Sequence, residues 1–185
     1  MYWEKMGPQN TKATVEAALK RTRELNLNYL VVASSTGRTA ENFLNPQNKN
    51  NIKVVCVTYH AGFTVPGQTT MLPETKGRLE EGGIKVLTAT HLLAGVNRAL
   101  KNKFNGIYPA EIIAYTLRIL GQGVKVGVEI ACMALDAGLI PYGEDVITIA
   151  GSGKGADTAL VIRPAHSNYF FEAKIKEIIC KPREI

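Results

Sequence analysis

Residues 29–40 read Tyr29-Leu30-Val31-Val32-Ala33-Ser34-Ser35-Thr36-Gly37-Arg38-Thr39-Ala40, an apolar run that breaks into hydroxyl side chains and a glycine. The apolar half is typical of a fully buried strand. The polar half leads into residues 40–44, which can be helical, so unpaired backbone N–H groups are predicted to converge beside a helix start. Such a turn favours a phosphate. We call residues 34–39 the cradle; they are Ser34, Ser35, Thr36, Gly37, Arg38 and Thr39.

The side chains of the cradle also suit an anion. Gly37 allows close approach of the backbone, the hydroxyl groups can donate hydrogen bonds, and Arg38 brings a full positive charge. The alternative is an ordinary helix cap followed by a solvated arginine. Four hydroxyl groups exceed what a cap needs, so the sequence predicts a phosphate site.

Composition limits the class of protein. With 185 residues, 45% hydrophobic and 21% charged, the chain is predicted to be one globular domain over residues 1–185. The net charge of +6 comes from lysines and arginines spread along the whole sequence, which favours an anionic small ligand over nucleic acid. No apolar run approaches the ~20 residues of a membrane span, so no membrane partner is expected. An assembly of identical chains is left open.

The three cysteines stand singly in apolar stretches and form no Cys-x-x-Cys pair. This pattern favours buried, reduced thiols in a cytoplasm over disulfides or a zinc site. No cluster with metal-ligand spacing, no paired carboxylates and no Ser-His-Asp order stands out, so spacing identifies no metal site and no catalytic residue. Glu129, which lies on a predicted helix, is expected at the surface or in a cap.

The predicted elements indicate an α/β fold, a three-layer α/β/α sandwich whose sheet is mostly parallel. Only residues 151–157 join the strands predicted at 145–150 and 158–162. A parallel crossover needs about a dozen residues, so that pair is predicted to be antiparallel. Residues 1–10 are expected to be a lead-in, 46–51 a polar loop and 167–174 a turn or coil. Strands are predicted over 29–33, 52–58, 84–87, 145–150, 158–162 and 175–180, and helices over 11–26, 73–81, 93–104, 109–120 and 124–137.

Ligands of open α/β sheets gather outside the carboxyl ends of the parallel strands. By this rule four loops should converge: residues 34–39, 59–67, 90–91 and 151–157. His60 and His91 are then placed to touch a ligand, whereas His166 should lie at the opposite end. A structural role for each histidine is the alternative.

Two of these loops carry further hints. The stretch Gly151-Ser152-Gly153-Lys154-Gly155 lacks the full phosphate-binding motif and leads into a strand, so it is either a mobile hairpin able to fold over an anion or a simple turn. Tyr59 and Phe63 offer aromatic surface that would suit a flat heterocycle with a phosphate tail; ordinary packing is the alternative.

The chain resembles the C-terminal domain of pyruvate kinase, on the helix at 11–26, the cradle with the strands around it, and residues 145–151 with the glycine-rich hairpin. In that family the domain holds a sugar-bisphosphate effector, with one phosphate in the Ser/Thr-Gly-x-Thr loop. A complete pyruvate kinase also needs a (β/α)₈ barrel of ~250 residues, so no kinase activity is expected. Over nearly its full length, including residues 121–126 and 151–166, the chain looks more like the stand-alone, largely archaeal and uncharacterised proteins related to this domain, which are associated with flavin mononucleotide (FMN).

The second resemblance implies FMN as cofactor and leaves open whether the protein is a flavin-dependent oxidoreductase. The alternative is a non-enzymatic sensor of a sugar phosphate; in either case the partner is a phosphorylated small molecule. The cradle, from Ser34 to Thr39, would take the ribityl phosphate. The sugar chain and the ring would be surrounded by His60, Gly62, Phe63, Gly151, Gly153, Lys154 and Gly155. A lysine or a backbone N–H near the pyrimidine edge would stabilise negative charge on reduced flavin.

Overall fold

The computed structural model describes residues 1–45 and 52–184, and the predicted polar loop at 46–51 lies outside them. Within the described residues, seven strands form one sheet in the order β1-β7-β6-β5-β2-β3-β4. The strands are β1 (Tyr2–Trp3), β2 (Tyr29–Ala33), β3 (Lys53–Tyr59), β4 (Lys85–Ala89), β5 (Val146–Ala150), β6 (Thr158–Arg163) and β7 (Lys174–Pro182).

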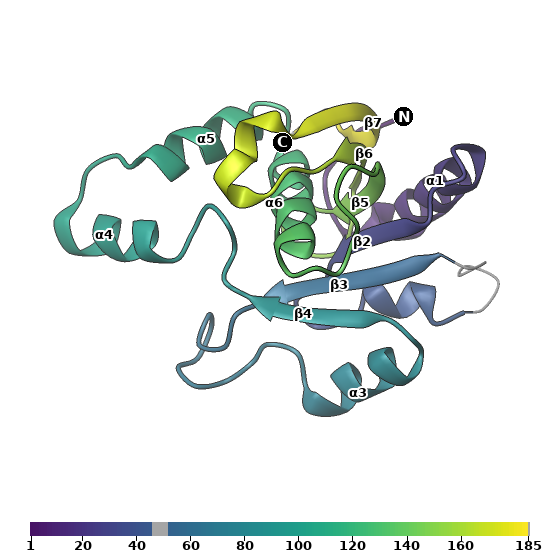
Figure 1. Ribbon diagram of the computed structural model, residues 1–185, viewed down its shortest axis with the longest axis horizontal. Helices are drawn as coiled ribbons and strands as arrows, with labels where there is room; N and C mark the ends of the chain where they lie inside the picture. Colours follow the sequence, from purple (N-terminus) through teal and green to yellow (C-terminus); the bar gives the residue numbers. More distant parts are fainter. Residues whose placement is uncertain (46–51, 185) are drawn as a thin grey trace.

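Helices cover both faces of this sheet, which confirms the predicted α/β class (Figure 1). The α-helices are α1 (Thr11–Glu24), α3 (Pro73–Glu81), α4 (Val96–Phe104), α5 (Pro109–Arg118) and α6 (Gln122–Asp136). The described ranges also contain three short 3-10 helices, which are η1 (Pro8–Asn10), η2 (Ala40–Phe43) and η3 (Ser167–Glu172).

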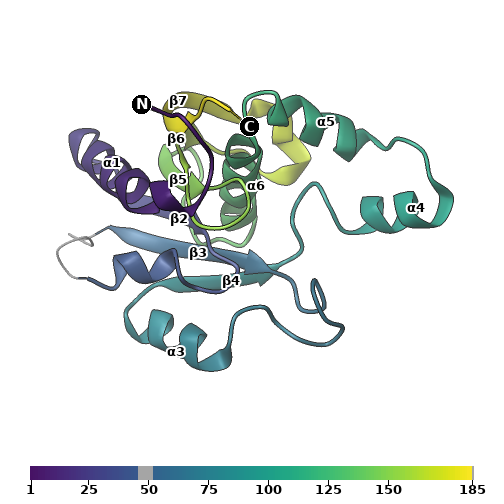
Figure 2. The same cartoon turned by 180° about the vertical axis from the view of Figure 1, so that it is seen from behind.

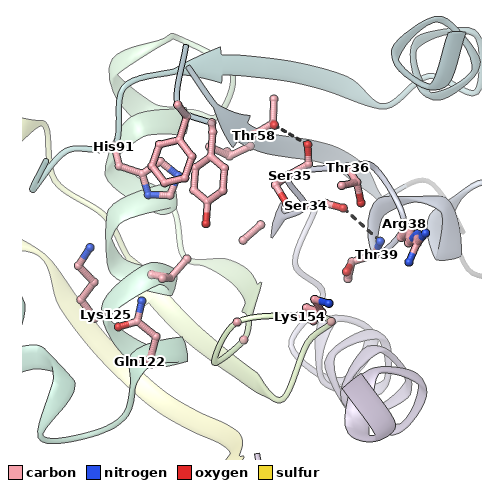
Figure 3. Close-up of a pocket in the computed structure, with 18 of the residues that line it drawn as sticks. Ser34, Ser35, Thr36, Arg38, Thr39, Thr58, His91, Gln122, Lys125 and Lys154 are labelled. Carbon is pink, nitrogen blue, oxygen red and sulfur yellow. Dashed lines mark hydrogen bonds between the residues drawn. The ribbon is translucent and has the colours of Figure 1, made fainter. Parts of the chain in front are cut away.

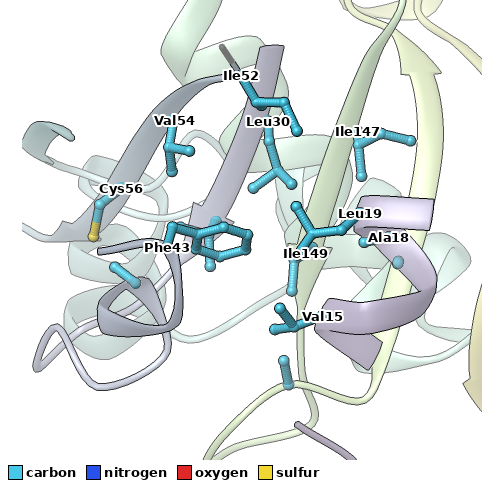
Figure 4. Packing of buried hydrophobic residues seen from close by; sticks show 14 of the residues in the cluster. Val15, Ala18, Leu19, Leu30, Phe43, Ile52, Val54, Cys56, Ile147 and Ile149 are labelled. Atoms are coloured by element: carbon cyan, nitrogen blue, oxygen red, sulfur yellow. The ribbon is translucent and has the colours of Figure 1, made fainter. Parts of the chain in front are cut away.

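Alternate side chains of the central strands feed two separate cores, as the pleat of a strand requires. Leu30 of β2 packs on one face with Leu19 of α1 and Phe43 of η2 (Figure 4). Its neighbour Val31 points to the other face and packs with Ile130 of α6. The unbroken apolar run at residues 29–33 therefore indicated a strand buried on both sides.

The order of the strands creates a switch point beside β2. The chain runs from β2 outward through β3 to β4, all parallel, and then returns to add β5 on the other side of β2. Loops that leave the carboxyl ends of β2 and β5 therefore diverge around a crevice. The predicted antiparallel pairing of β5 with β6 is confirmed, from Val146 opposite Ile162 to Ala150 opposite Thr158.

Three local predictions were wrong or held only in part. The lead-in contains β1, which pairs in parallel with the end of β7 and forms one edge of the sheet. The helix expected after the cradle is the four-residue η2, too short to present an appreciable dipole. The expected turn or coil at residues 167–174 contains η3 and the first residue of β7.

Helices α4 and α5 extend away from the sheet, on the left in Figure 1 and on the right in the reverse view of Figure 2. We call residues 96–118 the arm. Helix α4 buries none of its residues, and the exposed fraction reaches 75% for Val96 and 80% for Ile107. The α4 half of the arm is therefore weakly packed. No helix in the described ranges is long and apolar enough to cross a membrane.

Candidate functional site

The cradle begins where β2 ends, and its shape is fixed by hydrogen bonds. The Ser34 hydroxyl oxygen accepts hydrogen bonds from the backbone N–H groups of Thr39, at 3.1 Å, and Ala40, at 3.4 Å. The Thr58 hydroxyl of β3 donates to the carbonyl oxygen of Ser35 at 2.9 Å (Figure 3). The Ser34 side chain thus stabilises the turn through the hydrogen bonds within it, and Thr58 of the neighbouring strand holds the turn against the sheet.

Gly37 is required by the turn itself. Its φ of 92° is rarely adopted by other residues, and a Cβ at this position would lie 2.5 Å from Cγ2 of Thr75 in α3. The backbone N–H groups of residues 35–38 have no hydrogen-bond acceptor among residues 1–45 and 52–184. Four consecutive donors are therefore available to an anion at the mouth of the turn.

The glycine-rich loop opposite the cradle is anchored at its base. The fully buried Asp157 accepts hydrogen bonds from the backbone N–H groups of Gly7, at 3.1 Å, and Ser152, at 3.2 Å. The Thr11 hydroxyl at the start of α1 accepts one from the N–H of Ala156 at 2.9 Å. Lys154 stands exposed at the tip, beside the cradle (Figure 3).

A cleft of about 600 Å³ lies between these two loops, within the range of about 300–1,000 Å³ that is usual for small-molecule sites. Three of the predicted residues, Gly37, His60 and Gly62, are not among its lining residues. His91, the other candidate histidine, does line it. His166 instead bonds to Asp136 at the far end of α6, as expected. The structure brings together at the cleft Ser34, Ser35, Thr36, Arg38, Thr39, Phe63, Gly151, Gly153, Lys154 and Gly155.

Aromatic rings form one wall of the cleft. The rings of Tyr59 and Phe63 stack with centroids 3.8 Å apart and an interplanar angle of 15°. His91 lies against Tyr59, with ring centroids 5.0 Å apart. His60, which the sequence placed at the site, packs edge-on against Phe63 at 5.7 Å, outside the lining. The wall offers a flat apolar surface next to the charged cradle.

The charge of the cleft is strongly positive. Its lining includes Arg38, Arg98, Arg118, Lys125 and Lys154 and, in the part of the chain that the structure describes, no aspartate or glutamate. Of these five cations only Lys125 forms an ion pair with a carboxylate in the described ranges. Unpaired positive charges facing one concave surface favour an anionic ligand.

Lys125 owes its position to a buried network that the sequence analysis missed. Glu129, predicted at the surface or in a cap, is fully buried and pairs with Lys125 one turn earlier on α6. Its other oxygen accepts a hydrogen bond from the backbone N–H of Leu93 at 2.9 Å, and Nδ1 of His91 lies 3.5 Å from the carboxylate. The correction has a simple reason: α6 is apolar on all sides, so a carboxylate on it must be buried and paired.

The network affects the ionisation of both partners. Burial lowers the pKa of Lys125 against the opposing charge of Glu129, and Arg118 and Arg98 lower it further. Burial also disfavours the charged form of Glu129, but the hydrogen bond from His91 and the charge of Lys125 outweigh it, so the pKa of Glu129 is lowered. Glu129 is therefore a carboxylate at neutral pH and keeps a cation at the cleft wall.

The missed residues differ in how far sequence could reveal them. Lys125 and Glu129 carry opposite charges four residues apart within an apolar helical run, which is a readable sign of a buried pair. Arg98 and Arg118 carry no such sign, because the arm's placement brings them to the cleft. The described residues contain no cluster of three or more histidine, cysteine, aspartate or glutamate side chains able to hold a metal ion.

The family model for the pyruvate kinase alpha/beta domain matches residues 12–162. Among solved structures, a Cryptosporidium parvum pyruvate kinase is similar at 12% identity and a TM-score of 0.43, over 84% of this chain and 23% of that chain. The same organism's pyruvate kinase in complex with ADP is similar at 15% identity and a TM-score of 0.39, over 82% of this chain and 22% of that chain. This chain thus spans less than a quarter of the length of those enzymes.

Proposed function

Since the chain belongs to the family of the pyruvate kinase alpha/beta domain, we propose that it binds a phosphorylated small molecule, FMN, in the cleft beside β2 and β5. One observation carries the proposal: five basic side chains line a cleft whose described lining has no carboxylate, and the cradle at its edge has four backbone N–H groups without an acceptor in the described ranges. A ligand of 600 Å³ or less with a phosphate at one end satisfies this arrangement.

The cradle is the phosphate subsite of this proposal. Its N–H groups from residues 35–38 supply directional donors, and Arg38 and Lys154 supply charge from two sides (Figure 3). The hydroxyl groups of Ser35 and Thr36 line the same surface. These contacts act without help from the helix dipole first expected there, because η2 is so short.

The stacked Tyr59 and Phe63 favour FMN over a sugar phosphate. A flat three-ring heterocycle offers more area for dispersion and stacking on two aromatic rings than a sugar phosphate does. Bound FMN would supply two-electron transfer, which the side chains of the cleft do not supply themselves. The more specific proposal is that the protein is a flavin-dependent oxidoreductase. The chain's own part is to bind, to orient the ring and to set its electrostatic surroundings.

Flavin titration tests the proposal. The fluorescence of FMN should be quenched when FMN binds to the protein. FMN should also bind more tightly than riboflavin, which has the same ring without the phosphate. Replacing Thr36 and Arg38 together by alanine should weaken FMN binding at least about tenfold, since a charge-assisted hydrogen bond contributes ~1.5–3 kcal/mol. Riboflavin affinity should stay unchanged in that variant. Both side chains are exposed, so the fold should be retained.

A second measurement separates FMN from a sugar phosphate. The thermal midpoint of the protein is recorded with FMN, riboflavin, a sugar phosphate or inorganic phosphate added at equal concentration. Stabilisation by the sugar phosphate alone would favour the sensor. No shift with any of the four, together with a colourless purified protein, would overturn ligand binding in the cleft.

A further inference from the structure

Three cations from three different helices meet at the end of the cleft away from the cradle. Arg98 comes from α4, Arg118 from α5 and Lys125 from α6, and all three line the cleft. The charges of the two arginines also lower the pKa of Lys125. We call these three residues the cationic wall.

Contacts with uncharged groups hold the arginines of the cationic wall. The Arg118 guanidinium donates from Nε to the amide oxygen of Gln122 at 2.7 Å and lies 4.9 Å from the ring centroid of Tyr115. The Arg98 guanidinium lies 5.7 Å from the ring centroid of Phe63, on the aromatic wall. Neither forms an ion pair with a carboxylate anywhere in the described ranges. Both charges are therefore uncompensated.

Glu129 neutralises only part of this charge. It lies behind Lys125, fully buried and outside the lining of the cleft, where a ligand does not reach it. Three cations against one carboxylate leave an excess of two positive charges at this end. Like charges gathered without counter-charges are unfavourable in the protein alone and become favourable when an anion joins them.

The cationic wall and the cradle face each other across the cleft. In Figure 3, Lys125 and Gln122 lie on one side of it, and Arg38, Thr39 and Lys154 lie on the other. The aromatic wall of Tyr59 and Phe63 belongs to the same cleft. A ligand fixed by its phosphate in the cradle and stacked on the aromatic wall therefore turns its far end toward the cationic wall.

We propose that the cationic wall contacts the pyrimidine edge of the flavin ring. As a result, the cleft binds reduced, anionic FMN more tightly than oxidised FMN. The inference rests on the proposed function. Oxidised isoalloxazine takes up two electrons and one proton to become an anion with its charge on the pyrimidine edge. In the test the electrons come from dithionite and the proton from water. Positive charge beside that edge stabilises the anion more than the neutral ring.

Two dissociation constants test the inference. The dissociation constants of oxidised FMN and of dithionite-reduced FMN are measured in the absence of oxygen, by fluorescence and by calorimetry. The midpoint potential of bound FMN is measured separately. The wild type should prefer reduced FMN at least tenfold, which corresponds to a midpoint potential raised by about 30 mV relative to free FMN. Riboflavin should show the same preference, because it carries the same ring.

Variants then identify the groups responsible. Arg98→Gln and Arg118→Gln should each lower the preference for reduced FMN by at least about threefold, because losing a positive charge weakens the binding of the reduced anion more than that of oxidised FMN. Arg23→Gln on α1 is the matched control, since Arg23 is exposed and far from the lining of the cleft. The double variant Lys125→Met with Glu129→Gln removes the buried pair as a unit and should lower the preference further.

The outcomes separate the two proposals. If neither redox form of FMN binds, the proposed function fails and the inference fails with it. If oxidised FMN binds, but reduced FMN binds no more tightly, the inference alone is refuted. It is also refuted if the preference exists but Arg98→Gln and Arg118→Gln leave it as it is in Arg23→Gln.

Discussion

Glu129 is the carboxylate on which the charge of Lys125 depends, so Glu129→Gln should destabilise the folded protein strongly at neutral pH. Glutamine keeps the shape and can still accept the hydrogen bond from the N–H of Leu93. It removes the negative charge, however, and leaves Lys125, only 7% exposed, without a counter-ion. Removing one partner of a buried pair typically costs about 3–5 kcal/mol.

The structure also sets an upper limit on this loss. Lys125 can escape as a neutral amine, and deprotonating a lysine of ordinary pKa 10.5 at pH 7 costs about 5 kcal/mol. Since Lys125 lines the cleft and reaches water there, we expect a loss of about 3 kcal/mol. Urea unfolding measures it as a lower midpoint concentration at an unchanged slope.

The pH dependence of the loss has a definite sign on each side of neutrality. In the variant the loss of Glu129 lowers the folded-state pKa of Lys125 further below that of the unfolded chain, so Lys125 loses its proton earlier in the folded state, stability rises with pH toward 10.5 and the loss shrinks. In the wild type the lowered pKa of Glu129 adds stability that is complete above the ordinary value of 4.5. This stability is lost as the pH falls through the lower folded-state pKa. The difference in free energy of unfolding between the wild type and Glu129→Gln therefore also narrows at low pH. A loss below 1 kcal/mol at pH 7, or one that grows with pH, would refute the buried network.

Three further predictions concern the turn, the loop anchor and the thiols. Gly37→Ala should lower the free energy of unfolding by about 2–4 kcal/mol, because a Cβ there combines a positive φ with a clash; Gly77→Ala in α3, where a Cβ meets nothing, should instead be neutral or slightly stabilising in the same urea assay. Asp157→Asn should lower stability by about 1–3 kcal/mol and weaken FMN binding in the titration, because the anchors of the glycine-rich loop are lost; unchanged binding would mean that Lys154 needs no anchored loop. Burial raises the pKa of Cys56 to about 12 and that of Cys132 to about 11, so thiol reagents at pH 8 should label neither residue until the protein unfolds.

Local patterns were enough to predict six of the seven strands described and about half of the cleft. The buried strand β2 and the cradle adjoin in the sequence, so their contact needs no long-range information. The antiparallel β6 followed from the length of one loop, since seven residues cannot cross back over a sheet. The convergence of loops followed from the rule that parallel strands end at the same edge.

The remaining parts depend on contacts between distant segments. Strand β1 has only two residues and exists because it pairs with Lys181 and Pro182 near the other end of the chain. Arg98 and Arg118 reach the cleft through the placement of the arm, which no periodicity encodes. The burial of Glu129 differs from these, because its spacing of four residues from Lys125 within an apolar helical run is a local pattern that predicts a buried pair.

The weakly packed arm has a thermodynamic consequence for the whole cleft. Two of its arginines line the site, yet α4 buries none of its own residues. A molecule whose arm leaves the cleft loses Arg98 and Arg118 from the lining, so the observed affinity is then the intrinsic affinity scaled by the fraction of molecules in which the arm lies at the cleft. A molecule that covers Val96 and Ile107 and so holds the arm at the cleft raises the affinity for the ligand. By reciprocity, bound ligand holds the arm at the cleft to the same degree.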